Sequence, residues 1–135
     1  MGRSAFRGGF WLVAILSLFA SISASAQNVD LAAAEAQFVK SCGTCHTLDE
    51  AAPARQGPVL MHVLGATAGT NPNFSKYSDA LKKAGADGLV WTEDKLDAWL
   101  TNPAKLVPGV NMPYRQRDPE KRKLVIAFLK SRSAQ

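Results

Sequence analysis

The chain has 135 residues, a length that predicts a single domain. Hydrophobic residues make up 47% of it and charged residues 20%, which is ordinary globular composition and argues against a disordered chain. The 16 basic residues exceed the 11 acidic ones by only five, so the charge offers little support for nucleic-acid binding. Two cysteines are too few for a disulfide-rich scaffold or for a four-thiolate metal site.

The N-terminal residues have the pattern of an export signal. Arg3 and Arg7 precede an uncharged apolar stretch, residues 10–20, and small residues ending in Ala24-Ser25-Ala26 follow. This order predicts a secretory signal peptide over residues 1–26, cleaved after Ala26. A retained anchor is the alternative, but the apolar stretch is about half of the roughly 20 residues that a spanning helix needs. We therefore expect residues 27–135 to fold as one domain in the bacterial periplasm, without stable membrane insertion.

Helical patterns account for three or four short helices in the remaining chain. The first follows the N-cap Asp30 and ends near Cys42. The next 40 or so residues are rich in glycine and proline and leave room for one short helix, over residues 78–83. Most of this segment is therefore expected to be loop.

Two further helices are predicted in the C-terminal part. One is capped by Thr92 and stops at Asn102-Pro103, and the other begins at Asp118-Pro119 and carries an apolar stripe. No alternating strand pattern occurs, so the expected fold class is all-α. Because long loops bury little continuous apolar surface, we expect something other than protein to fill the middle of the domain.

The pentapeptide Cys42-Gly43-Thr44-Cys45-His46 carries the strongest chemical signal in the chain. A C-x-x-C-H sequence is typical of covalent attachment of a c-type heme. On a helix Cys42 and Cys45 are neighbours at i and i+3, so both sulfurs can reach one edge of a porphyrin and form thioethers. His46 follows where the helix ends and can present its imidazole to the iron. We expect one covalent heme per chain.

Two other kinds of site could use a cysteine pair at this spacing. A thioredoxin-type C-x-x-C would sit at a junction between a strand and a helix, and this chain offers no strand pattern. A zinc site would need a second pair of ligands, and His62 is the one further histidine or cysteine in the chain. Heme attachment accounts for the motif and the export signal together.

The sixth position of the iron could be filled by Met61, His62 or Met112, or be left open. Met61 and His62 come soon after His46, which leaves the chain little length to cross the edge of the ring. Met112 lies in a proline-braced loop between two helices and can reach the opposite face of the heme. We therefore predict Met112 as the ligand, with Met61 as an apolar filler and His62 as a loop residue.

The chain resembles class I c-type cytochromes, the monoheme family that includes mitochondrial cytochrome c and its bacterial relatives. The resemblance covers the chain from about Asp30 to Lys130. Its motifs occur in the family's order: the C-x-x-C-H pentapeptide, Gly57-Pro58-Val59-Leu60, Tyr77-Ser78-Asp79-Ala80, Trp91 with Leu96, Trp99-Leu100-Thr101-Asn102-Pro103, Pro108-Gly109-Val110-Asn111-Met112 and Ile126-Ala127-Phe128-Leu129-Lys130.

This resemblance implies a small cytochrome c fold wrapped around the heme, and further roles for particular residues. The Pro58 carbonyl would accept the Nδ1 proton of His46. Tyr77 and Trp91 would hydrogen-bond a buried heme propionate. Phe38 and Phe128 would pack where the terminal helices cross.

The chain also departs from the family pattern around the heme. The substituted positions are His62 in place of glycine, Ala66 in place of arginine, Leu81 in place of asparagine, Trp99 in place of tyrosine and Val110 in place of threonine. The polar network is thus thinner, which is compatible either with neutral drift or with a shifted reduction potential and a different partner.

The function expected from these features is electron transport rather than catalysis. No carboxylate pair, nucleophile with a base, or phosphate-binding loop is present in the sequence. We expect a monomeric shuttle that carries single electrons between redox proteins, which dock near the exposed heme edge on a face formed by Lys105, Arg115 and Arg117. The alternatives are a heme subunit of a larger oxidoreductase, or a small heme enzyme or ligand sensor in which Met112 leaves the iron.

Overall fold

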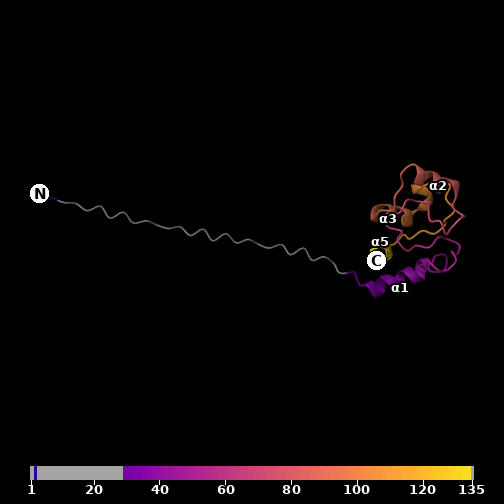
Figure 1. Ribbon diagram of the computed structural model, residues 1–135. Coiled ribbons are helices and arrows are strands. Elements are labelled where there is room, and N and C mark those ends of the chain that lie inside the picture. Colours follow the sequence, from indigo (N-terminus) through magenta and orange to yellow (C-terminus); the bar gives the residue numbers. More distant parts are fainter. Residues whose placement is uncertain (1, 3–28, 135) are drawn as a thin grey trace.

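The computed structural model describes residue 2 and residues 29–134, so the expected signal peptide lies outside the described residues. Five helices follow one another within these residues, and Figure 1 shows how the helices and loops are arranged. Their bounds are α1 Leu31–Cys42, α2 Asp79–Ala86, α3 Glu93–Thr101, α4 Pro103–Leu106 and α5 Pro119–Ser133. In this part of the chain the β structure amounts to one antiparallel bridge, between Thr67 and Val90. The all-α prediction is confirmed.

Short polar side chains start the helices as the sequence predicts. The Asp30 carboxylate accepts hydrogen bonds from the backbone N–H groups of Ala32 and Ala33, at 2.9 and 3.3 Å, and begins α1. The Thr92 hydroxyl accepts from Lys95 at 3.2 Å and begins α3. These bonds satisfy N–H groups that have no partner inside the helix.

The helix pattern differs from the prediction in two places. Helix α3 ends at Thr101 as expected, but Pro103 then begins the additional short helix α4. Proline suits the first position of a helix, because its φ is already helical and no N–H partner is needed there. Helix α2 continues past the predicted end at Lys83 to Ala86. Within this added part, Gly85 lies so close to the Ala68 carbonyl that a β-carbon would not fit.

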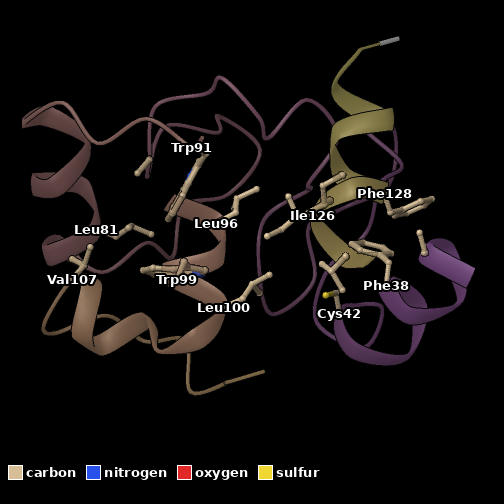
Figure 2. Packing of buried hydrophobic residues seen from close by; sticks show 14 residues of the cluster. Phe38, Cys42, Leu81, Trp91, Leu96, Trp99, Leu100, Val107, Ile126 and Phe128 are labelled. Carbon is tan, nitrogen blue, oxygen red and sulfur yellow. The ribbon is translucent and has the colours of Figure 1, made fainter. Parts of the chain in front are cut away.

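The terminal helices pack against each other and form one half of the core. The rings of Phe38 on α1 and Phe128 on α5 lie 5.0 Å apart between centroids, tilted by 43°, and Figure 2 shows them side by side. Phe128 is only 2% exposed. The predicted contact where the terminal helices cross is confirmed.

The other half of the core is built around α3. Leu96, Trp99 and Leu100 are buried on one face of this helix, and the ring of Trp91 meets that of Trp99 edge to face at 5.1 Å (Figure 2). The long segment between α1 and α2, residues 43–78, buries only Gly57, Val59 and Ala68. The loops therefore line the interior without filling it.

Candidate functional site

Helix α1 delivers the cysteine motif to the interior of the domain. The helix ends at Cys42, and the backbone N–H groups of Cys45 and His46 both donate to the Cys42 carbonyl, at 3.0 and 2.9 Å. These two bonds form a turn that continues from the end of α1 through the motif. The Arg55 guanidinium donates to the Gly43 carbonyl and ties the following loop to the same turn.

Both sulfurs of the motif are free thiols. Burial, with a smaller contribution from Cys45, raises the pKa of the Cys42 thiol to about 11. The Cys45 thiol is half-buried and lies 3.4 Å from the Gln56 side-chain oxygen. Two reduced sulfurs one turn apart fit thioether formation along one edge of a porphyrin.

The His46 imidazole is held by the loop that follows the motif. Its Nδ1 lies 2.8 Å from the Pro58 carbonyl oxygen. A carbonyl can only accept, so Nδ1 carries a proton, and in the neutral ring Nε2 then keeps its lone pair. Burial lowers the pKa of His46, and the Pro58 hydrogen bond partly offsets this. The imidazole is thus neutral and has Nε2 available to bind a metal.

Gly57 gives His46 the space it occupies. A β-carbon at this position would lie 2.7 Å from Nδ1 and 2.8 Å from Nε2 of the ring, and closer still to Cε1. Real β-carbons essentially never come so near to other heavy atoms, so only glycine lets the backbone pass the ring. The sequence places Gly57 beside Pro58, but nothing in the pattern indicates this close approach.

A cavity of about 560 Å³ opens beside the motif, a volume typical of small-molecule and cofactor sites. Cys42, Cys45, His46 and Met112 all line it, together with apolar side chains from α3, α5 and the loops. No polar or charged residue is fully buried among the described residues. Two thiols, one neutral imidazole and a thioether around an apolar cavity fit a covalently attached heme.

Met112 is half-buried at the cavity and receives a hydrogen bond from α3. The indole Nε1 of Trp99 donates to the Met112 sulfur, at 3.2 Å. The sequence shows that tryptophan stands where tyrosine is usual in the family. It does not indicate the contact with Met112, because the two residues are 13 positions apart in the chain. The structure therefore connects one of the departures from the family pattern to the proposed ligand.

The two alternative ligands also line the cavity. Met61 is half-buried, and the His62 side chain is 47% exposed, with Nε2 3.9 Å from a carboxylate oxygen of Glu50. His62 has a φ of +56°, a left-handed conformation that favours glycine. The family's usual glycine at this position agrees with that backbone.

Tyr77 and Trp91 both line the cavity as well. Trp91 is buried, whereas Tyr77 is half-buried and packs edge-on against Phe74 at 4.8 Å. Burial raises the pKa of Tyr77, and a hydrogen bond with the Asn71 backbone partly offsets the shift. The hydrogen bonds expected between these two side chains and a heme propionate remain a prediction.

The basic residues near the Met112 segment divide into two groups. Lys121, Arg122 and Lys123 on α5 are paired with Asp118, Asp97 and Glu120, at 3.4, 2.7 and 2.8 Å. Lys105, Arg115 and Arg117 are exposed and take no part in the ion pairs formed among the described residues.

Other kinds of site find little support in the part of the chain that the structure describes. No three histidine, cysteine, aspartate or glutamate residues gather there in a way that could hold a metal ion. None of its helices is long and apolar enough to cross a bilayer.

Comparison with known proteins yields one family. The family model described as Cytochrome c matches residues 31–133. The chain is 43% identical over 101 residues to cytochrome c2 of Agrobacterium tumefaciens (strain II Chrys), which covers 74% of this chain and 89% of that protein. It is 40% identical over 106 residues to cytochrome c2 of Afifella marina, with 78% and 85% covered.

Solved structures agree with these sequence matches. Cytochrome cH from Methylobacterium extorquens superposes with a TM-score of 0.65 at 40% identity, and cytochrome c2 from Rhodospirillum centenum with 0.71 at 32% identity. Each superposition covers 76% of this chain and 98% of the other.

Proposed function

The chain belongs to the cytochrome c family as a class I monoheme c-type cytochrome that carries electrons and binds one covalent heme c, and we propose that it shuttles between redox enzymes of the bacterial periplasm. On this proposal residues 1–26 are a cleaved export signal and residues 27–135 are the mature, monomeric domain. The observation that carries the proposal is the convergence of the cysteine motif and Met112 on one apolar cavity of about 560 Å³.

The residues of the cavity have distinct proposed roles. Cys42 and Cys45 would hold the heme through thioethers, and the Nε2 of His46 and the sulfur of Met112 would bind the iron. The heme supplies an iron that gains or loses one electron without leaving the protein. Tyr77 and Trp91 are proposed to hydrogen-bond a propionate.

The protein keeps the ligands in place for electron transfer. Pro58 and Gly57 orient the His46 ring, because one accepts the Nδ1 proton and the other leaves room for the ring. Apolar side chains exclude water, which favours the less charged ferrous state in a low-dielectric interior. Trp99 adds a donor to the Met112 sulfur. Together these features favour a relatively high reduction potential.

The ligand assignment is tested by ligand binding to variants. Met112→Ala should open the sixth position and bind added cyanide rapidly, while Met61→Ala and His62→Ala should bind it as slowly as the unmodified protein. Rapid cyanide binding by His62→Ala alone would identify His62 as the ligand instead. Covalent attachment is checked by mass spectrometry after acid-acetone extraction, and complete heme release would contradict it.

The basic rim, defined as Lys105, Arg115 and Arg117, is proposed as the docking face for redox partners. Arg115 directly follows Tyr114, which lines the cavity, and Lys105 lies on α4 before the segment that carries Met112. Because these side chains are exposed and outside the ion pairs, their charge is available to a partner. Transient electron-transfer contacts bury little area and depend on electrostatic steering.

Stopped-flow oxidation by an acidic redox partner tests the docking face. Reversing the basic rim to glutamate should slow the bimolecular reaction and weaken its salt dependence, since steering is screened over about 10 Å near 0.1 M salt. The matched control reverses Lys40, Lys83 and Lys95, which lie on α1, α2 and α3 and give the same change in net charge. Equal effects of the two triple variants would refute this docking face.

A further inference from the structure

The segment that carries Met112 is attached to the rest of the domain by few bonds. We define the Met112 loop as residues 107–118, between α4 and α5. In the described structure, residues 108–115 of this loop make no backbone hydrogen bond to other backbone groups. The Trp99 bond to the Met112 sulfur is the side-chain contact that holds its middle. The loop therefore depends on how its ends are fastened.

The C-terminal end of the loop is fastened at Gln116 and Arg117. The Gln116 N–H donates to the Leu100 carbonyl at the end of α3, at 2.7 Å. One Arg122 nitrogen, Nη1, donates to two consecutive loop carbonyls, Gln116 at 3.1 Å and Arg117 at 3.0 Å. One side chain of α5 thus holds two successive peptide groups of the loop.

The same guanidinium is anchored to α3 by a carboxylate. Arg122 Nε donates to Asp97 Oδ1 at 2.7 Å, and Nη2 lies 3.5 Å from Oδ2. The Arg122 side chain is only 12% exposed, whereas that of Asp97 is 45% exposed. A mostly buried charge that satisfies one carboxylate and two carbonyls forms stronger bonds than an exposed surface pair. The planar fork of arginine suits such a set of acceptors, and lysine cannot reproduce it.

We propose that Arg122 is a positioning residue that keeps the Met112 loop closed and so controls how readily Met112 leaves its ligand position. This inference rests on the proposed function, in which Met112 fills the sixth coordination position. With Arg122 in place, only residues before Gln116 are free to move when Met112 departs. Without it, Gln116 keeps its backbone bond to Leu100 but the Gln116 and Arg117 carbonyls lose the Arg122 donor, so the departure of Met112 requires less distortion of the backbone.

Two variants of the heme-loaded protein test the role of Arg122. Arg122→Met removes every polar contact of the side chain but keeps much of its length, and Arg122→Lys keeps the charge without the fork. The control is Arg132→Met, because Arg132 is also a half-buried arginine of α5 but contacts α1, through Glu35 at 4.0 Å, and stacks on Phe128. Three quantities are measured: the rate of cyanide binding to the ferric protein, the hydrogen exchange of the Gln116 amide, and the free energy of unfolding.

The expected result is specific to the loop. Arg122→Met should bind cyanide about tenfold faster or more, because it removes hydrogen bonds from a charged donor, and its Gln116 amide should exchange correspondingly faster. Arg122→Lys should lie between this variant and the unmodified protein. Arg132→Met should lower the free energy of unfolding without changing either rate. Equal acceleration by Arg132→Met, or unchanged cyanide binding in Arg122→Met, would overturn the proposal.

The Met112→Ala variant separates this inference from the ligand assignment on which it rests. If Met112→Ala binds cyanide no faster than the unmodified protein, the ligand assignment is wrong, and the role proposed for Arg122 is refuted with it. If Met112→Ala binds cyanide rapidly but Arg122→Met does not, the ligand assignment stands and only the role of Arg122 is refuted.

Discussion

Replacing Gly57 with alanine should disturb His46 more than any other glycine substitution near the site. The added β-carbon would lie 2.7 Å from Nδ1 and 2.8 Å from Nε2, whereas ordinary contact begins at 3.4 Å. The ring or the backbone must therefore move by more than half an ångström, and the 2.8 Å bond from Nδ1 to Pro58 is lost or lengthened.

The size of the effect follows from two contributions. Overpacking an interior position costs about 1–3 kcal/mol, and losing a hydrogen bond costs about 1 kcal/mol. Gly57→Ala should thus lower the free energy of unfolding of the heme-loaded protein by about 2–4 kcal/mol. Guanidinium unfolding followed by tryptophan fluorescence measures this change. A displaced His46 should also let carbon monoxide bind the ferrous protein more readily.

Gly65→Ala is the control, because Gly65 has a φ of +84° and its added β-carbon would have no atom within 4 Å. Gly65→Ala should lower the free energy of unfolding by only about 1–2 kcal/mol, the cost of placing alanine in the left-handed conformation. It should leave the heme spectrum and carbon monoxide binding unchanged. If Gly57→Ala is no less stable than Gly65→Ala and binds carbon monoxide no better than the unmodified protein, the proposed packing of His46 against Gly57 is wrong.

Two further predictions concern departures from the family pattern. Trp99→Phe should lower the reduction potential by about 20–60 mV, because it removes from the Met112 sulfur a hydrogen bond worth ~0.5–1.5 kcal/mol and so weakens the preference for ferrous iron. A potentiometric titration measures this change, and an unchanged potential would show that the bond does not tune the iron. His62→Gly should unfold at a higher denaturant concentration than His62→Ala, because its free energy of unfolding should be larger by about 1 kcal/mol. Both variants remove the side chain near Glu50, but only glycine relieves the strain of the +56° φ. Coincident unfolding curves for the two variants would argue against backbone strain at this position.

Features that depend on residues close together in the chain could be predicted from the sequence. Asp30 and Thr92 cap their helices through bonds that span two or three residues. The cysteine motif is similarly local, because its spacing alone brings two sulfurs and an imidazole to one turn. The contact of Phe38 with Phe128 is a long-range feature, and it was predicted from the family resemblance rather than from the residues themselves.

Proline shows where local signals mislead. The sequence pattern predicts that a helix stops at Asn102-Pro103, and Pro103 does follow the end of α3, but it also begins α4. The same residue type stops one helix and starts another, because it lacks an N–H donor and has a fixed φ. Only the path of the following chain decides which role applies.

The sequence alone determined the covalent chemistry, the starts of α1, α3 and α5 and the all-α class, since each of these depends on side chains within about one helical turn of one another. Tertiary structure alone decided the environment of the ligands. Gly57 makes room for His46, 11 positions away in the numbering, Trp99 donates to Met112 across 13 residues, and Arg122 reaches Asp97 across 25. These contacts exist because loops and helices that are distant in the chain pack against one another, and no periodicity or spacing along the chain records which distant backbone will pass beside which side chain.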